Sequence, residues 1–217
     1  MHLAIIPDGN RRWADSRNVA HHQGHQAGMK ALMELFESFK QFDAIHEITL
    51  FGFSTENAGR SLIEVTAISS LLKQHSKHIV ERCVELNFRI SVLGDFQSMP
   101  TKDRIICEQM MQQTQACDGK VINFCYYFSG HWHLEKALLK AKKSELSLKD
   151  VMNEWLKPVD LLIRTGKEHR ISNFCLYQLA YAELYFSEVY WPDFGSDTLK
   201  KALDWFSTRK RRYGVDG

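Results

Sequence analysis

Short runs of apolar and β-branched residues alternate with longer segments of helical periodicity along this chain of 217 residues. Runs of about four to eight such residues are typical of strands, and apolar residues about three or four positions apart are typical of helices. The expected strands are 2–6, 47–53, 88–93, 121–127, 160–163 and 184–186, and the expected helices are 26–42, 62–86, 101–116, 134–143, 148–155 and 197–211. This alternation predicts βαβ units and therefore an α/β fold, in which helices flank a mostly parallel central β-sheet.

The size and composition of the chain favour one soluble domain. Four prolines and twelve glycines leave no stretch typical of a flexible linker, so we expect a single domain over residues 1–217. A formal net charge of +2 gives no reason to expect a nucleic acid as a partner. No apolar run could span a bilayer, no signal peptide is recognisable, and the five cysteines include no C-x-x-C pair. We therefore expect a cytoplasmic protein with reduced thiols.

Polar segments follow three of the expected strands. Residues 8–12 follow the first strand, residues 54–60 follow the second, and residues 164–170 follow the fifth. Ligands of parallel α/β sheets bind beyond the carboxyl ends of the strands, where loops lead into helices. We therefore expect the chemistry of this protein to lie in these three segments.

The first segment, Asp8-Gly9-Asn10-Arg11-Arg12, combines a carboxylate with two cations. A carboxylate just after a buried strand suits Mg²⁺, which prefers hard oxygen ligands and shared phosphate oxygens. Gly9 allows a ligand to approach the backbone, and guanidinium groups match the geometry of phosphate oxygens. The alternative is an ordinary Asp-Gly turn with solvated arginines, and these residues alone favour that alternative.

The segment 164–173 gathers three cations, one histidine and two small hydroxyl side chains, namely Arg164, Lys167, Arg170, His169, Thr165 and Ser172. We expect this segment to be a loop that leads into a helix. A helix N-terminus with arginines and a serine beside it is suited to bind an anion, so we expect an anion site here. The alternative is a surface loop with local ion pairs, and the residues alone favour neither interpretation. The spacings G-x-x-x-x-G-K-[ST] and G-x-G-x-x-G are absent, so neither nucleotide fingerprint is present.

Three further features each allow two interpretations. Ser54 and the polar residues after it could end a strand at the site or cap the following helix. The histidines near residue 21 lack a matching carboxylate or cysteine set for a metal, so His25 is better explained as a phosphate partner or proton carrier. The apolar stripe of the expected 62–86 helix is typical of a core, and also of a wall that lines an apolar tunnel.

Taken in order, these motifs resemble the undecaprenyl diphosphate synthase family, the cis-prenyltransferases. The resemblance runs from His2 to about Tyr213. It includes Ala4-Ile5-Ile6-Pro7-Asp8-Gly9-Asn10-Arg11-Arg12-Trp13-Ala14, Gly24-His25-x-Ala27-Gly28, Phe53-Ser54-Thr55-Glu56-Asn57 and Leu93-Gly94-Asp95. Its most specific part comprises Arg164-Thr165-Gly166, Arg170-x-Ser172-Asn173-Phe174, Gln178-x-Ala180-Tyr181-Ala182-Glu183-Leu184-Tyr185-Phe186 and Trp191-Pro192-Asp193-Phe194. The D-D-x-x-D motif that a trans-type prenyl synthase would need is absent.

The resemblance implies the cis-prenyltransferase fold, a homodimer, and Mg²⁺-dependent condensation of isopentenyl diphosphate with dimethylallyl, geranyl or farnesyl diphosphate. It implies that Asp8 holds Mg²⁺ and that Asn10, His25 and Asn57 assist catalysis. It assigns substrate binding to Gly9, Arg11, Arg12, Trp13, Ser54, Glu56, Arg60, Arg164, Arg170 and Ser172. Glu183, with His169, would support the metal of the isopentenyl diphosphate, and Glu183 would reach into the site of a partner subunit. The apolar product implies a peripheral contact with a membrane.

The chain departs from the family pattern around the expected substrate pocket. It reads Asn57-Ala58-Gly59-Arg60-Ser61 where Asn-Trp-x-Arg-Pro is usual, and Ser129-Gly130-His131 where Gly-Gly-Arg is usual. His21 stands in place of a common arginine, and Lys167 in place of a second glycine. The lost tryptophan and Pro7 resemble the branch that makes irregular, lavandulyl-type diphosphates, whereas His25 and Glu56 resemble the regular enzymes.

Three functions follow from this pattern. The first is a regular prenyltransferase that makes a short or medium polyprenyl diphosphate. The second uses the same fold for irregular condensation or cyclisation of dimethylallyl diphosphate. The third is a non-catalytic partner subunit. A scaffold has no use for a whole set of site residues, so the retained set argues against it, namely Asp8, Arg12, Arg170, Ser172 and Glu183.

Overall fold

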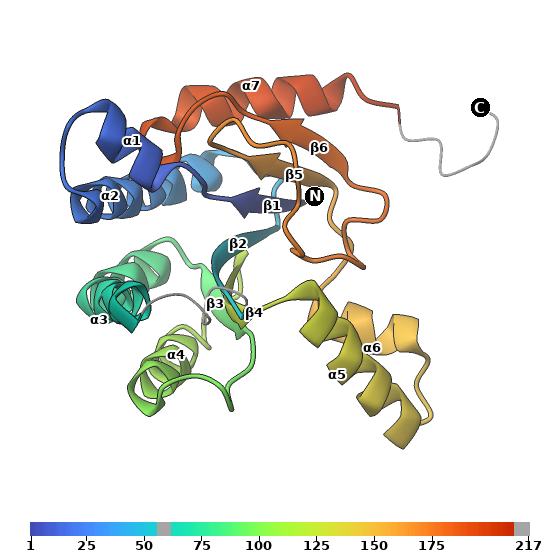
Figure 1. The fold of residues 1–217 in the computed structure, drawn as a ribbon. Helices are drawn as coiled ribbons and strands as arrows, with labels where there is room; N and C mark the ends of the chain where they lie inside the picture. Colours follow the sequence, from blue (N-terminus) through green and yellow to red (C-terminus); the bar gives the residue numbers. More distant parts are fainter. Residues whose placement is uncertain (56–61, 211–217) are drawn as a thin grey trace.

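The computed structural model describes residues 1–55 and 62–210. Its strands form one sheet (Figure 1). The strands are β1 (His2–Ile6), β2 (Glu47–Ser54), β3 (Arg89–Leu93), β4 (Val121–Phe128), β5 (Leu161–Arg164) and β6 (Glu183–Phe186). Their order across the sheet is β3-β4-β2-β1-β5-β6, and every pairing between neighbours is parallel. The predicted α/β fold is confirmed, and each strand lies within one residue of its expected bounds.

The helices of the described ranges are α1 (Asn10–Ser16), α2 (His21–Gln41), α3 (Leu62–Glu85), α4 (Thr101–Gln113), α5 (Gly130–Lys143), α6 (Leu148–Trp155) and α7 (Ser196–Ser207), with one short 3-10 helix, η2 (Trp191–Asp193). Helix α1 was not predicted, because it is short and buries only Ala14. Helix α2 begins before its expected start, since its first turn is polar and has no apolar periodicity. In the described part of the chain, no helix has both the length and the apolar character needed to cross a membrane.

Alternate residues of the strands build two cores on opposite faces of the sheet. Leu3 and Ile5 belong to the larger core, to which α2, α3, α4 and α7 contribute, whereas Ala4 and Ile6 belong to a smaller one. Figure 1 shows α3 and α4 on one side of the sheet, and α5 and α6 on the other. Burial on both faces explains why the strands are nearly continuous apolar runs in the sequence.

The segment that follows Asn173 is not the helix expected from the sequence. Residues 172–181 form turns and bends, and Ser172, Asn173 and Cys175 have φ angles of 50°, 59° and 41°. Residues in the left-handed region cannot continue a right-handed helix. The expected anion site at a helix N-terminus is therefore wrong, and side chains supply the cationic groups of this segment.

Candidate active site

Two of the polar segments meet at the carboxyl edge of the sheet, beside the end of a third strand. In the register of β1 and β5, Ile6 lies opposite Arg164, so Asp8 stands just beyond the same edge. Strand β2 pairs with β1 on its other side and ends at Ser54. Because parallel strands end at one edge, the fold brings Asp8 within hydrogen-bond distance of Arg164, 156 positions away in the sequence.

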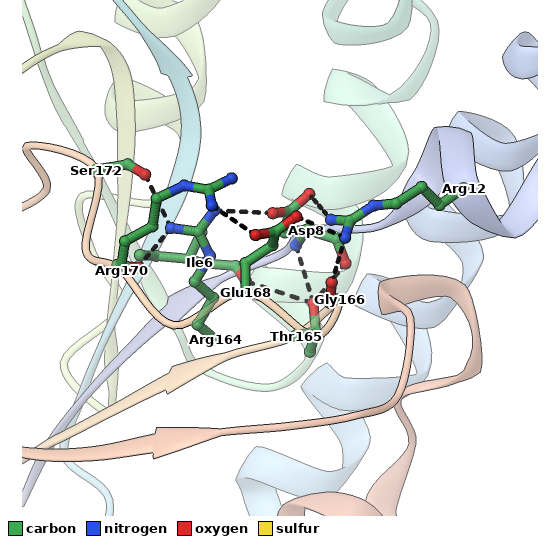
Figure 2. A network of polar contacts seen from close by, with 9 residues as sticks. All are labelled: Ile6, Asp8, Arg12, Arg164, Thr165, Gly166, Glu168, Arg170 and Ser172. Atoms are coloured by element: carbon green, nitrogen blue, oxygen red, sulfur yellow. Dashed lines mark hydrogen bonds and ion pairs between the residues drawn. The ribbon is translucent and has the colours of Figure 1, made fainter.

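The carboxylate of Asp8 lies between two guanidinium groups (Figure 2). Its Oδ1 is 3.0 Å from Arg12 Nη2, and its Oδ2 accepts a hydrogen bond of 2.8 Å from Arg164 Nη2. Thr165 Oγ1 accepts from the Asp8 N–H at 2.9 Å and donates to the Asp8 carbonyl at 2.7 Å. The backbone of Asp8 is therefore held in place, while its side chain remains 29% exposed and lines a cavity.

Glu168 links two arginines of the same cluster, although it was not among the predicted site residues. Its Oε1 is 2.8 Å from Arg12 Nη1, and its Oε2 is 2.5 Å from Arg170 Nη1. With Arg164, three guanidinium groups face the carboxylates of Asp8 and Glu168, so positive charge is in excess. Glu168 lies between the Arg164-Thr165-Gly166 and Arg170-x-Ser172 motifs, but no sequence signal indicates its pairing with Arg12, 156 positions away.

The loop after β5 folds back onto Asp8. Arg164 Nη1 donates to Ser172 Oγ at 2.8 Å and to the carbonyl of Arg170 at 2.5 Å. Gly166 has a φ of 86°, and a Cβ at this position would stand 2.9 Å from both the Asp8 carbonyl oxygen and Arg12 Nη2. Only glycine meets both constraints, because it has no Cβ and adopts positive φ without strain.

A cavity of about 1060 Å³ adjoins this cluster. Ten predicted site residues line it, namely Asp8, Gly9, Asn10, Arg11, Arg12, His25, Ser54, Arg164, Arg170 and Ser172. Its apolar lining includes Leu32 of α2, Leu72 of α3 and Met110 of α4. Ile79 of α3 packs in the larger core and also lines the cavity. The apolar stripe of this helix is therefore part of the core and also part of a cavity wall, the two interpretations that the sequence allowed.

The amide of Asn10 is positioned by the close packing of α1 against α2. Asn10 Oδ1 is buried and has no hydrogen-bond partner among the described residues. A Cβ on Gly28 would stand 2.3 Å from this oxygen, so the glycine leaves the space that the amide occupies. A buried acceptor without a partner is costly, and such a group is available to a donor from a ligand.

Trp13 does not line the cavity. Its Nε1 donates to Asp193 Oδ1 at 2.8 Å, and the guanidinium group of Arg17 lies 4.2 Å from the centroid of its ring. Glu56, Asn57 and Arg60 lie outside the described residues. Among the departures from the family, Lys167 has a φ of 64° and its Nζ lies 5.5 Å from the ring centroid of Tyr190.

The three predicted metal ligands are not brought together within one chain. Glu183 begins β6 opposite Leu161, three residues before the edge at which Arg164 and Phe186 pair. The ring of His169 lies at that edge, 5.1 Å from the ring of Phe186. Glu183 and His169 therefore stand at opposite ends of β6, and neither lines the cavity beside Asp8.

The donors around Asp8 fit a magnesium ion that the protein shares with its substrate. Mg²⁺ commonly binds one or two carboxylates together with water and the phosphates of a substrate. The Asp8 carboxylate supplies hard oxygens at the wall of the cavity, and the described ranges contain no group of three or more His, Cys, Asp or Glu side chains suited to a metal. A magnesium ion here would therefore be held by Asp8 and by oxygens of a diphosphate.

Fold and site together define a parallel α/β protein with a cationic pocket at the carboxyl edge of its sheet. Residues 6–214 match the family model described as putative undecaprenyl diphosphate synthase. The chain is 38% identical to a ditrans,polycis-undecaprenyl-diphosphate synthase ((2E,6E)-farnesyl-diphosphate specific) of Pectobacterium atrosepticum, over 98% of this chain and 89% of that one. It is 39% identical to dehydrodolichyl diphosphate synthase 3 of Arabidopsis thaliana, over 98% of this chain and 75% of that one.

A solved structure has a closely similar fold. The crystal structure of lavandulyl diphosphate synthase from Lavandula x intermedia, in complex with dimethylallyl diphosphate, matches with a TM-score of 0.92 and 27% identity. The match covers 99% of this chain and 98% of that one. This chain belongs to the undecaprenyl diphosphate synthase family, the cis-prenyltransferases. The predicted family is therefore confirmed.

Proposed function

We propose that this protein is a Mg²⁺-dependent cis-prenyl diphosphate synthase that condenses isopentenyl diphosphate with an allylic diphosphate and releases diphosphate. One observation carries the proposal. A cluster with three guanidinium groups adjoins a cavity of about 1060 Å³ whose remaining lining is largely apolar. A prenyl diphosphate has the same two parts, because its head is a diphosphate and its tail is a hydrocarbon.

Two diphosphates share the cationic cluster in this proposal. The allylic diphosphate lies against Gly9, Arg11 and Arg12, and the isopentenyl diphosphate against Arg170 and Ser172. Arg12 and Arg170 are 36% and 59% exposed, so diphosphate oxygens can reach the guanidinium groups that now pair with Glu168. Guanidinium groups already held in place need little reorganisation when charge develops, which favours catalysis.

The reaction breaks the allylic C–O bond, and the diphosphate leaves with the bonding electron pair. A new carbon–carbon bond forms to isopentenyl diphosphate, which then loses a proton. A magnesium ion bound to Asp8 would neutralise charge on the leaving diphosphate. Arg11 and Arg12 would stabilise the remaining charge, and the apolar walls would keep water away from the electron-poor carbon.

A turnover assay tests this function. Purified protein with Mg²⁺ receives labelled isopentenyl diphosphate, either alone or with dimethylallyl, geranyl or farnesyl diphosphate, and the products are sized by chromatography. We expect lengthened prenyl diphosphates only when an allylic diphosphate and Mg²⁺ are both present. A well-folded protein that lengthens none of them would overturn the proposal and would favour a non-catalytic subunit.

A second candidate is irregular condensation or cyclisation of dimethylallyl diphosphate. The TM-score of 0.92 with a lavandulyl diphosphate synthase gives it only weak support, because both reactions use the same fold. The undecaprenyl and dehydrodolichyl diphosphate synthases at 38% and 39% identity favour the regular reaction instead. A further arm of the assay, with labelled dimethylallyl diphosphate and no isopentenyl diphosphate, separates the two, because a product formed there would support the second reaction and exclude the first.

We also propose that the protein works as a cytoplasmic homodimer. Glu183 and Asp8 lie near opposite ends of their strands, so a Glu183 that acts at the metal must act in a second copy of the chain. Tyr181 and Leu184, beside Glu183, are 67% and 39% exposed, and β6 is an edge strand of the sheet. Contact with a membrane would arise only through the apolar product.

A further inference from the structure

A buried carboxylate stands behind the apolar wall of the cavity. Asp103 of α4 is 1% exposed. Its Oδ1 accepts a hydrogen bond of 2.5 Å from Ser69 Oγ of α3, and its Oδ2 accepts one of 2.6 Å from the hydroxyl of Tyr126 of β4. A carboxylate is costly to bury unless it is hydrogen-bonded, so these two bonds are what allows Asp103 to lie here. We call Ser69, Asp103 and Tyr126 the polar brace.

Each member of the polar brace belongs to an element that forms a wall of the cavity. Tyr126 itself lines the cavity from β4. Cys107 and Met110 line it from α4, within the two turns that follow Asp103. Ile68 and Leu72 line it from α3, on either side of Ser69 along the chain. The helices α3 and α4 lie side by side (Figure 1).

The polar brace joins three walls through a single carboxylate. Each oxygen of Asp103 takes its partner from a different element, so α3, α4 and β4 cannot separate without leaving a buried charge short of a partner. Apolar contacts lack this constraint, because they are non-directional and tolerate small shifts of one helix past another. A leucine at position 103 could fill the space, but it would not set the distance between the walls.

The ring of Tyr126 is itself held in position. Its centroid lies 5.8 Å from that of Phe53 and 5.2 Å from that of Tyr127. Burial, with the hydrogen bond to Asp103, raises the pKa of Tyr126 above its ordinary value. The phenol therefore stays protonated at physiological pH and remains a hydrogen-bond donor to Asp103.

We propose that the polar brace limits the width of the cavity and thereby the length of the prenyl chain that the enzyme makes. Ser69, Asp103 and Tyr126 act in this proposal as positioning residues, and none of them takes part in bond formation. The inference rests on the proposed function, because it needs an enzyme that lengthens a prenyl chain inside this cavity.

Variants of the polar brace test the inference by product length. We expect Tyr126→Phe and Asp103→Leu each to shift the product distribution toward chains longer by one or more isoprene units. Asp103→Asn should keep the wild-type distribution, because its carbonyl can accept from Tyr126 and its NH₂ can donate to Ser69. The rate of the first condensation should stay close to the wild-type rate, since the cationic cluster is untouched.

The double variant Tyr126→Phe with Asp103→Leu separates specificity from stability. It replaces the polar brace with apolar contacts and leaves no buried charge, so its thermal midpoint should be at least that of Tyr126→Phe alone. Its products should nevertheless be longer than those of the wild type. Thr49→Val is the matched control, because Thr49 is a buried hydroxyl bonded to His2 and Asn123 outside the cavity lining.

The outcomes distinguish this inference from the proposed function. A wild-type enzyme that elongates, with a folded double variant that returns wild-type product lengths, would overturn the inference alone. Longer products from Thr49→Val as well would also overturn it, because any loss of a buried hydrogen bond would then have the same effect. A wild-type protein that lengthens no allylic diphosphate would overturn the proposed function and this inference together.

Discussion

Arg164 places a buried positive charge between segments that are far apart in the sequence. Its Nη2 donates to Asp8 beyond the end of β1, and its Nη1 donates to Ser172 after β5. A guanidinium group makes both contacts at once because its donors lie in one plane and point in different directions. A lysine would carry the same charge without this geometry, so the position depends on shape as well as on charge.

Arg164→Lys should therefore lower kcat/KM for isopentenyl diphosphate by about ten- to a hundred-fold, since about one charge-assisted hydrogen bond is lost. Steady-state kinetics with varied isopentenyl diphosphate measures the change. Arg89→Lys, at an exposed arginine that begins β3, is the matched control and should leave kcat/KM unchanged. Wild-type kinetics for Arg164→Lys would show that the planar geometry of the guanidinium group is not required at this position.

Asp8→Ala should abolish turnover, because the carboxylate proposed to hold Mg²⁺ is removed. The thermal midpoint should fall by a few degrees. The ion pair with the half-exposed Arg12 contributes little, whereas the buried Arg164 loses one partner and keeps its hydrogen bonds to Ser172 and to the carbonyl of Arg170. Turnover and thermal unfolding are measured on the same preparation, with the surface variant Asp118→Ala as a control. Retained turnover would rule out Asp8 as the metal anchor.

At the scale of elements, the close contact of α2 with α1 depends on Gly24. A Cβ at this position would stand 2.1 Å from the carbonyl oxygen of Asn10. Helix α1 carries Asn10, Arg11 and Arg12, so its distance from α2 sets where these side chains lie at the cavity. Backbone atoms cannot give way as the end of a flexible side chain can, and any added atom must move α1.

Gly24→Ala should reduce the free energy of unfolding by about 1–3 kcal/mol, which is typical of overpacking. It should also lower kcat, because Asn10 and the arginines of α1 shift with the helix. Denaturant unfolding and steady-state kinetics measure the two effects. Gly195→Ala is the matched control, since a Cβ there meets no atom within 4 Å and should leave both quantities unchanged.

The packing of α5 on α6 predicts a pH dependence of stability. His133 is 2% exposed, its ring stacks 5.3 Å from that of Trp155, and neither ring nitrogen has a hydrogen-bond partner in the described ranges. Burial lowers the pKa of His133 to about 4, from 6.5 for a free histidine. Below pH 6.5 this histidine is protonated in the unfolded chain, whereas in the folded chain it stays neutral until the pH approaches 4. The free energy of unfolding therefore decreases as the pH falls from 6.5 to 4.

His133→Phe should remove this contribution, which amounts to about 3 kcal/mol at pH 4. Phenylalanine keeps an aromatic ring beside Trp155 and has no nitrogen to protonate. The free energy of unfolding is measured at intervals from pH 7 to pH 4. The exposed variant His46→Phe serves as a control and should keep the steep wild-type profile. An unchanged slope for His133→Phe would show that other groups cause the loss.

At the scale of the whole molecule, the separation of Glu183 from Asp8 predicts that two chains share each site. Asp8→Ala and Glu183→Ala proteins should each be inactive alone. After unfolding and refolding together, about half of the dimers are mixed, and each mixed dimer has one site with both native residues. We expect about a quarter of the wild-type turnover, measured beside a mass determination of the assembly. No recovery, in dimers shown to exchange chains, would place Glu183 outside the site.

The strands and the cationic motifs could be predicted because their signals are local. A run such as residues 2–6 is apolar enough to indicate a buried strand, and the polar residues that follow it mark the edge of the sheet. Helix α1 and the turns after Asn173 could not be predicted in this way. The first has too little apolar surface to show a period, and the second depend on φ angles that non-glycine residues rarely adopt.

The sequence by itself determined the α/β class, the six strands and the family, because the signals for each come from neighbouring residues or from motifs in a fixed order. Only the tertiary structure decided which charges meet, since Glu168 reaches Arg12 and Arg164 reaches Asp8 across 156 positions. It also decided that Asp103 stands behind the wall of the cavity and that Glu183 lies away from Asp8. Such contacts depend on how the chain crosses the sheet, and no local pattern of residues encodes them.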